Sequence, residues 1–237
     1  MATLEISEYI EDYGPELGET LFYVHTHWCR LFSIFAQYSN LFGKSKKRVD
    51  LLNETAGPFF KNVQDTFHDE ILLGICRLTD PAESKVRKDI HRNVSVLRLE
   101  KLIDVPEISS KINDLAILAK SSADFARRQR DKKISHADLE VVTGRSALES
   151  GASILQMREA IKSIHDVIFA ICFDIRGVHQ APFVIGSRSE FGLLSSLYDA
   201  QQAKEEIRKK VMNEFQSYRN FYPDWLFDED EEQNWKM

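Results

Sequence analysis

The sequence predicts an all-α protein with a substantial core of its own. Only 10 glycines and 6 prolines occur in 237 residues, too few for the frequent tight turns of a β-sandwich or barrel. Apolar residues recur every three or four positions over long stretches, which is the period of an α-helix. With 43% hydrophobic residues, a chain of this length buries a core without disulfides or bound metal.

The first long helix is expected from about Leu17 to Gly43. One face of it carries apolar side chains at helical spacing: Val24, Trp28, Leu31, Phe35, Tyr38 and Phe42. The basic turn Lys44–Arg48 ends this helix. A second stripe marks the next helix: Phe60, Val63, Phe67, Ile71, Gly74 and Leu78. That helix ends at Thr79-Asp80-Pro81, because proline cannot continue the hydrogen-bond ladder.

The segment Ala82–Arg92 is charged and is expected to be a loop, followed by a short helix over Val94–Ile103. Pro106 suits the first turn of the next helix. The apolar positions of that helix follow at three- and four-residue steps: Ile112, Leu115, Leu118, Ser122 and Phe125.

The clearest stripe marks the last core helix, which stops near Gly177. It runs through seven positions: Ile154, Met157, Ile161, Ile164, Ile168, Ile171 and Ile175. Such a stripe suits either a bundle core or a seam between subunits. A more polar helix is expected over Ser189–Phe221, followed by an acidic and aromatic tail, Tyr222–Met237. We therefore divide the chain into a helical domain, 1–180, and a C-terminal helical extension, 181–237.

Composition limits the classes of protein. The three cysteines are isolated and lie in apolar runs, which excludes a disulfide framework and a cysteine-rich zinc site and favours a reducing compartment. The acidic N-terminal segment is not a signal peptide, and no run approaches about 18 apolar residues. We expect a cytoplasmic protein without a membrane span, a metal or a cofactor. A net charge of −6 argues against coating nucleic acid by global charge but leaves room for a local basic site.

One basic stretch carries candidate chemistry: Arg127-Arg-Gln-Arg-Asp-Lys-Lys-Ile-Ser-His136. Within a continuous helix, Arg130 and His136 would point apart, because six residues turn the side chain by about 600°. They converge only if the helix breaks between them. Ser135 and Asp138 resemble a capping pair that would begin a new helix there, with His136 beside backbone N–H groups that favour phosphate.

This pair suits cleavage of RNA without a metal, in which the 2′-hydroxyl attacks the adjacent phosphorus. Histidine titrates near neutral pH and can move the proton, whereas arginine supplies fixed, directed donors to the phosphoryl oxygens. We expect Arg130 and His136 to be catalytic, with Asp131 orienting one of them. The neighbouring cations would bind RNA: Arg127, Arg128, Lys132 and Lys133.

Simpler interpretations compete with this one. Short Arg–His spacings occur by chance, and a second one, Arg158 with His165, most simply forms a polar edge of the last core helix. The first pair would then be a charged helix end with a surface histidine. Arg77 and Asp80 are expected to form an ion pair that fixes packing, or else to support the site, with Asp69 able to join them.

The motif residues Arg130, Asp131 and His136 resemble those of the HEPN superfamily of all-α dimeric ribonucleases and their inactive relatives. The segment Phe67-His-Asp-Glu-Ile-Leu-Leu-Gly-Ile-Cys-Arg-Leu-Thr-Asp80, followed by proline, is similar to the second long helix of the abortive-infection, type U, HEPN-like branch. The resemblance covers about Leu17 to Gly177.

This resemblance implies a bundle of four to five core helices whose homodimer brings two Arg–His pairs into one cleft. It implies RNA as the substrate, a role as a toxin or phage-defence effector, and a nucleotidyltransferase-type antitoxin as a partner. Two rivals stay open: a dimeric adaptor or RNA-binding module without catalysis, and a bundle that binds a nucleotide or another small ligand. The acidic residues Asp228–Glu232 would either be solvated or occupy the basic cleft as an RNA mimic.

Overall fold

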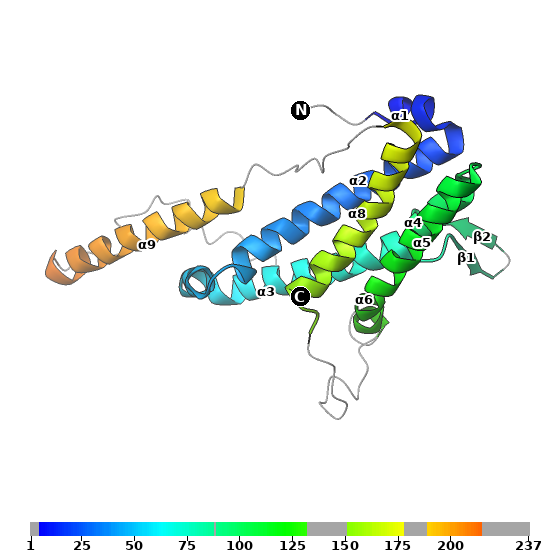
Figure 1. The fold of residues 1–237 in the computed structure, drawn as a ribbon. Helices are drawn as coiled ribbons and strands as arrows, with labels where there is room; N and C mark the ends of the chain where they lie inside the picture. The colour runs from blue at the N-terminus through cyan, green and yellow to red at the C-terminus, as the bar shows by residue number, and fades with distance from the viewer. Residues whose placement is uncertain (1–4, 88, 132–150, 178–188, 215–237) are drawn as a thin grey trace.

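Helices α2, α3, α5 and α8 form the body of the fold in the computed structural model, which describes residues 5–87, 89–131, 151–177 and 189–214 (Figure 1). The helices have these bounds: α1 Ile6–Tyr13, α2 Pro15–Tyr38, α3 Lys46–Thr79, α4 Val96–Leu99, α5 Pro106–Ser122, α6 Asp124–Gln129, α8 Ile154–Arg176 and α9 Ser189–Glu214. Helix α8 packs against α5 and α2, and α2 packs against α1 and α3. The predicted helical class is confirmed.

The first two helices meet at a tight corner. Gly14 adopts φ +81°, a conformation that favours glycine, and Pro15 opens α2 at its first position. A Cβ atom on Gly18 would lie 2.2 Å from the carbonyl oxygen of Tyr9, so the close approach of α1 to α2 requires glycine there. Helix α2 continues into a π-helical turn, Ser39–Gly43, which confirms the predicted end of this segment.

Helix α3 starts earlier than its apolar stripe predicts. Ser45 accepts a hydrogen bond from the backbone N–H of Arg48 and caps the helix, so the basic segment opens α3 as well as separating it from α2. A kink at Ala56, two residues before Pro58, divides α3 into two arms. The helix ends at Thr79, as Pro81 predicts.

The charged segment after α3 is a β-hairpin, so the predicted loop over Ala82–Arg92 was wrong. Strands β1, Glu83–Val86, and β2, Asp89–Arg92, pair antiparallel with Glu83 opposite Arg92. Arg87 takes the positive φ of the turn, +58°. The short helix that follows is α4 with a 3₁₀ turn, Glu100–Leu102, and it begins at Val96 because Ser95 caps it.

Helix α5 begins at Pro106 as expected, but its buried face differs from the predicted stripe. Leu118 is 56% exposed, whereas Ala116 and Ala119 are fully buried against α8. Small side chains let the two helices approach closely. Phe125 is buried as predicted, but it belongs to α6, a separate short helix that starts after Ala123.

The isoleucine stripe of α8 lies inside the core of the single chain. Five of its members are at most 2% exposed: Met157, Ile161, Ile164, Ile168 and Ile171. Trp28 of α2 donates its indole N–H to the carbonyl oxygen of Ile161 at 2.9 Å, which fixes the two helices to each other. The stripe therefore packs in the core of the bundle. The alternative prediction, a seam between subunits, was wrong. Gly177, in the left-handed conformation, ends the helix as predicted.

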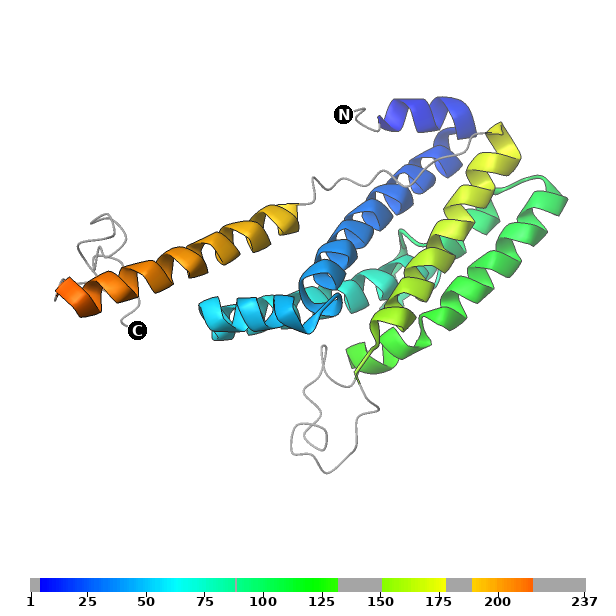
Figure 2. The same cartoon turned by 60° about the vertical axis from the view of Figure 1, so that its left-hand side comes forward.

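Helix α9 projects from the body of the bundle (Figures 1 and 2). Its first turns pack on α3 through a small second core of Leu41, Leu52, Phe60 and Leu194. Asn40 donates to the Glu190 carboxylate at 2.7 Å. The last residues of the predicted helix, 215–221, and the predicted tail, 222–237, lie outside the described residues. No helix in the described ranges combines the length and apolar character needed to cross a bilayer.

Candidate functional site at the end of α6

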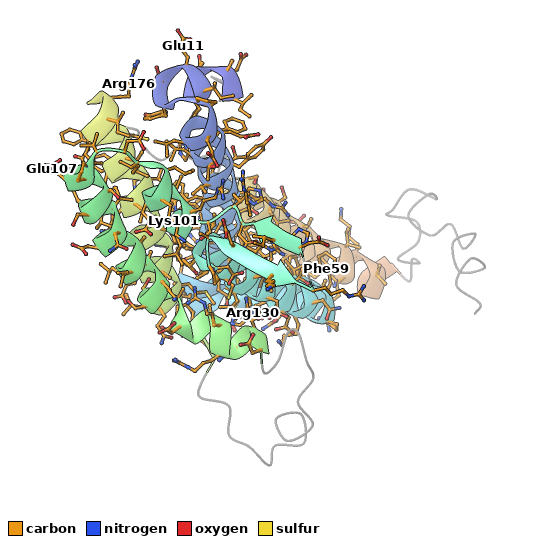
Figure 3. The ribbon with its side chains drawn as sticks, turned by 90° about the vertical axis from the view of Figure 1, so that its right-hand side faces the viewer. Glu11, Phe59, Lys101, Glu107, Arg130 and Arg176 are labelled. Atoms are coloured by element: carbon orange, nitrogen blue, oxygen red, sulfur yellow. The ribbon has the colours of Figure 1, made fainter. Side chains whose placement is uncertain are left out.

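The described half of the Arg–His motif lies where the ends of α3 and α6 meet. In Figure 3, Arg130 lies at the opposite end of the bundle from Arg176, the last residue of α8. Helix α6 packs on α3, and both Arg127 of α6 and Arg130, the residue that follows α6, extend toward the end of α3. The site therefore depends on two segments that are about 50 residues apart in the sequence.

Arg127 holds the end of α3. Its Nη2 donates to the carbonyl oxygen and to Oγ1 of Thr79, at 2.5 and 2.7 Å, and Thr79 is fully buried. Its Nη1 donates to the carbonyl oxygen of Lys120 at 2.8 Å and to the Asp124 carboxylate at 3.1 Å. Because the last carbonyls of a helix lack partners within it, this guanidinium supplies the donor that the buried carbonyl of Thr79 needs. It adds a second donor to the Lys120 carbonyl, which also accepts from the backbone N–H of Ala123.

Two of the three nitrogens of the Arg130 guanidinium have acceptors among the described residues. Its Nε donates to Asp131 at 2.9 Å and its Nη1 to Asp80 at 3.4 Å, and the side chain keeps 27% of its surface exposed. Nη2 makes no hydrogen bond to any residue that the structure describes. The hydrogen bond to Asp131 raises the pKa of Arg130 above its ordinary value, so the group is a permanent cation. Two anchored donors, with Nη2 unengaged among the described residues, suit binding of a phosphoryl oxygen.

Cys76 lies beneath these arginines and is 1% exposed. Burial raises the pKa of its thiol to about 11, although Arg130 partly opposes the shift. The thiol is therefore protonated at neutral pH, and since the thiolate is the reactive form, Cys76 is not a nucleophile here.

The acidic and basic groups of α3 pair differently from the prediction. Arg77 pairs with Glu70 at 3.2 Å instead of Asp80, because seven residues bring the two side chains to one face of α3. Asp80, which caps the end of α3, pairs with Arg130. Asp69 contacts its neighbour His68 at 3.2 Å and joins neither arginine. Of the three predicted supporting residues, only Asp80 contacts the part of the motif that the structure describes.

Other motif residues divide between the described and undescribed parts of the chain. Arg128 is exposed on α6, and Asp131 is exposed beside Arg130. Lys132, Lys133, His136 and the expected helix start at Ser135 lie outside the described residues. The role of Thr79 as the acceptor for Arg127 was not predicted. The only local sign of it was its place at the end of α3, just before Asp80 and Pro81.

The second Arg–His spacing lies on α8 and lines a surface groove. Arg158 and His165 are joined there by Trp28, Phe32 and Phe35 of α2. The His165 ring lies 4.6 Å from the Trp28 ring, centroid to centroid. The pair is on one face of its helix, as expected, but that face carries an aromatic groove in addition to polar side chains.

No group of three or more histidine, cysteine, aspartate or glutamate side chains is placed to hold a metal ion in the part of the chain that the structure describes.

A family model described as HEPN_AbiU2: AbiU2 matches residues 10–190 of this chain. The match includes the end of α3, all of α6 and the whole Arg–His motif. No curated protein and no solved structure matches the chain.

Proposed function

This chain belongs to the HEPN AbiU2 family, which is related to abortive infection, and we propose that it is a metal-independent endoribonuclease. It would serve as a toxin or phage-defence effector in the cytoplasm. The observation that carries the proposal is the state of Arg130, a permanent cation with two donors anchored and Nη2 unengaged among the described residues.

The reaction needs no group beyond the substrate and the side chains. The 2′-oxygen of RNA bonds to the adjacent phosphorus as the 5′-oxygen of the next nucleotide leaves. One proton departs from the 2′-hydroxyl and one is delivered to the leaving oxygen. Arg130 donates to the non-bridging oxygens while charge builds on them, and His136 moves one of the two protons. The products are a 2′,3′-cyclic phosphate and a 5′-hydroxyl end.

Asp131 and Asp80 hold the guanidinium in place for this role. Asp131, the residue after Arg130, accepts from Nε, and Asp80, at the end of α3, accepts from Nη1. Fixing a charged group before the substrate arrives lowers the reorganisation that the reaction requires. Arg128, Lys132 and Lys133 would bind the RNA backbone through charge, and Arg127 would position the helix that carries Arg130.

The proposal includes a homodimer with both Arg–His pairs in one cleft, and a nucleotidyltransferase-type antitoxin as partner. Both parts rest on the family resemblance. Because the isoleucine stripe of α8 is buried in the single chain, it does not supply the subunit contact.

A second candidate is a HEPN adaptor or RNA-binding module without catalysis. The observation that favours it is that Arg130 already contacts two carboxylates, which compete with a phosphate for its donors. An adaptor would use the same cation to hold a ligand without advancing a reaction.

The deciding experiment measures cleavage of total cellular RNA by the purified protein in excess EDTA. Arg130→Ala and His136→Ala are compared with Arg92→Ala and His91→Ala, a matched pair on the exposed strand β2. We expect cyclic phosphate ends from the wild type and from the β2 variants, and at least a 100-fold loss in the two motif variants. Circular dichroism checks that each variant is folded.

If the wild type leaves RNA intact, or if the motif variants cut as fast as the β2 variants, the adaptor replaces the ribonuclease. Expression in a host without the antitoxin gives an independent result. A ribonuclease slows growth and His136→Ala relieves the effect, whereas an adaptor does neither.

A further inference from the structure

A groove of about 230 Å³ lies between α2 and α8, on side chains that the proposed cleavage reaction does not use. Its lining comes from both helices: Trp28, Phe32, Phe35, Arg158, Ile161, Lys162 and His165. The surface that these residues expose to the groove is almost entirely carbon. The groove therefore accepts an apolar side chain in preference to a polar one.

The floor of the groove belongs to a row of aromatic rings. Phe32 stacks on Trp28 with the ring centroids 5.2 Å apart, and Trp28 contacts His165 on α8. From His165 the row continues along α8 to Phe169 at 6.1 Å and then to Phe173 at 6.0 Å. Aromatic rows of this kind bind other aromatic or aliphatic side chains with well-defined geometry.

The rim of the groove is positively charged. Arg158 is exposed and forms no ion pair within the described part of the chain, and Lys162 forms an exposed pair with Asp166 at 2.7 Å. Burial lowers the pKa of His165, so its ring is neutral at pH 7 and adds no charge. The groove thus complements an apolar side chain that is followed closely by carboxylates.

The same features argue against a nucleic-acid base in the groove. A base carries several donors and acceptors on its edges, and these lose hydrogen bonds with water when they enter a carbon-lined surface. Trp28 is only 2% exposed, so the half-buried rings of Phe32 and His165 provide the apolar contact in the groove. A protein segment fits the chemistry better than RNA does.

The chain itself contains such a segment. Trp225-Leu226-Phe227 is followed directly by Asp228-Glu-Asp-Glu-Glu232. Three consecutive apolar residues match the carbon-lined floor, and five consecutive acids match Arg158 and Lys162. Arg158 differs from Arg127 and Arg130 in that it forms no ion pair within the described part of the chain, whereas both of those arginines are paired with carboxylates of their own bundle.

We propose that the groove between α2 and α8 binds the Trp225–Glu232 segment of a second copy of this chain. The length of the chain favours a second copy over the same one. From Glu190, which contacts Asn40 in the π-helical turn after α2, α9 runs about 36 Å to Glu214. The eleven residues from there to Trp225 span at most about 40 Å. Returning to its own groove would require a fully extended segment, whereas a neighbouring copy imposes no such limit.

The outward direction of α9 supports this exchange. Between positions 202 and 211, no described residue of α9 forms a hydrogen bond or ion pair with the bundle. The helix therefore carries the chain away from its own body, as Figure 2 shows. The inference is independent of the ribonuclease proposal, because it concerns other residues and its tests do not measure cleavage.

The first test uses a fluorescent peptide of residues 222–237 and protein shortened to residues 1–221. Fluorescence anisotropy should show saturable binding, and Arg158→Glu in the protein should weaken it at least about tenfold. The matched charge reversal Lys101→Glu, on the 3₁₀ turn after α4, should leave the affinity unchanged. In the peptide, Trp225→Ala and a version with amides in place of the five acids should each bind about tenfold more weakly.

The second test identifies which copy supplies the segment. One copy carries p-benzoylphenylalanine at position 226 and keeps Arg158, and the other is the shortened protein, which differs in mass. Illumination of the mixture should give a cross-link between the two masses, mapped by mass spectrometry to α2 or α8 of the shortened copy.

Cross-linking only within one chain would overturn the second-copy inference. A peptide that fails to bind, or that binds Arg158→Glu as tightly as the parent, would overturn the groove itself. Cross-links at α6 would instead place the segment at the basic end of the bundle. Binding of a single-stranded RNA oligomer that is lost in Arg158→Glu, with no binding of the peptide, would make the groove a nucleic-acid site.

Discussion

Arg127 on α6 and Arg130 directly after it lie three residues apart and both extend toward the end of α3, yet their guanidinium groups are engaged to different extents. Arg127 donates to two carbonyls, a hydroxyl and a carboxylate, and 18% of its side chain is exposed. Arg130 contacts two carboxylates and keeps Nη2 unengaged among the described residues. The difference separates a residue that builds the site from one that is available to a ligand.

The largest expected effect is a loss of RNA cleavage on substitution of Arg130, the residue proposed to be catalytic. Arg130→Lys keeps the positive charge but cannot hold Asp80 and Asp131 while presenting another directed donor. We expect cleavage of a defined RNA oligomer to fall about 100-fold or more, with a change in unfolding free energy below about 1 kcal/mol. Arg92→Lys on β2 is the control. Equal activity of Arg130→Lys and wild type would show that charge alone matters.

The second effect concerns the structural member of the pair. Arg127→Ala leaves the buried carbonyl of Thr79 without its side-chain donor, whereas the Lys120 carbonyl keeps the backbone N–H of Ala123. We expect the free energy of unfolding in urea to fall by about 2–3 kcal/mol. Arg127→Lys should recover only part of this loss, because one ammonium group cannot reach acceptors on both sides. A stability loss below about 0.5 kcal/mol in Arg127→Ala would refute the assignment of this residue to the frame of the site.

The third effect isolates one contact of that frame. Thr79 donates its hydroxyl to the carbonyl of Ile75 and accepts from Arg127. Thr79→Val keeps the shape and should cost about 1 kcal/mol. A double-mutant cycle with Arg127→Ala should give a coupling energy of about 1 kcal/mol, and additive losses would mean that the two side chains act separately.

The smallest effect is expected at Asp80. Asp80→Asn keeps an acceptor oxygen but removes the charge that faces Arg130 in a partly exposed pair. We expect a change of less than about 1 kcal/mol in unfolding free energy and a smaller loss of cleavage than in Arg130→Lys. Urea denaturation and the oligomer assay measure the two quantities. A destabilisation as large as that of Arg127→Ala would show that Asp80 stabilises the fold, as Arg127 does, instead of acting mainly on Arg130.

Local patterns were enough for most of the fold. Pro81, Pro106 and Gly177 mark helix ends by what their backbones can do, and the structure confirms all three. The hairpin at Glu83–Arg92 was missed because its strands are four residues long, charged and exposed, and its turn uses Arg87 where glycine is usual. Leu118 was misplaced because alanines, not larger apolar residues, define the buried face of α5.

The candidate site was harder to predict from the sequence than the fold, because its contacts join segments that are far apart in the chain. A helix pattern suggests neighbours three or four residues away, which is why Asp80 was assigned to Arg77. The actual partner, Arg130, is 50 residues further along the chain. The motif itself could be recognised because its residue types suit one chemistry, but nothing local distinguishes Arg127 from Arg130.

The two hydrophobic cores give the molecule two tiers of cooperativity. The small core of Leu41, Leu52, Phe60 and Leu194 joins α9 to the π-helical turn and to both arms of α3, whereas the main core lies between α2, α8 and the later part of α3. Opening the smaller unit exposes few apolar side chains, so its free energy should be a fraction of that for global unfolding. Backbone amides of α9 should then exchange with deuterium well before those of α8, and the bundle that carries Arg130 would keep its packing while α9 detaches and reattaches.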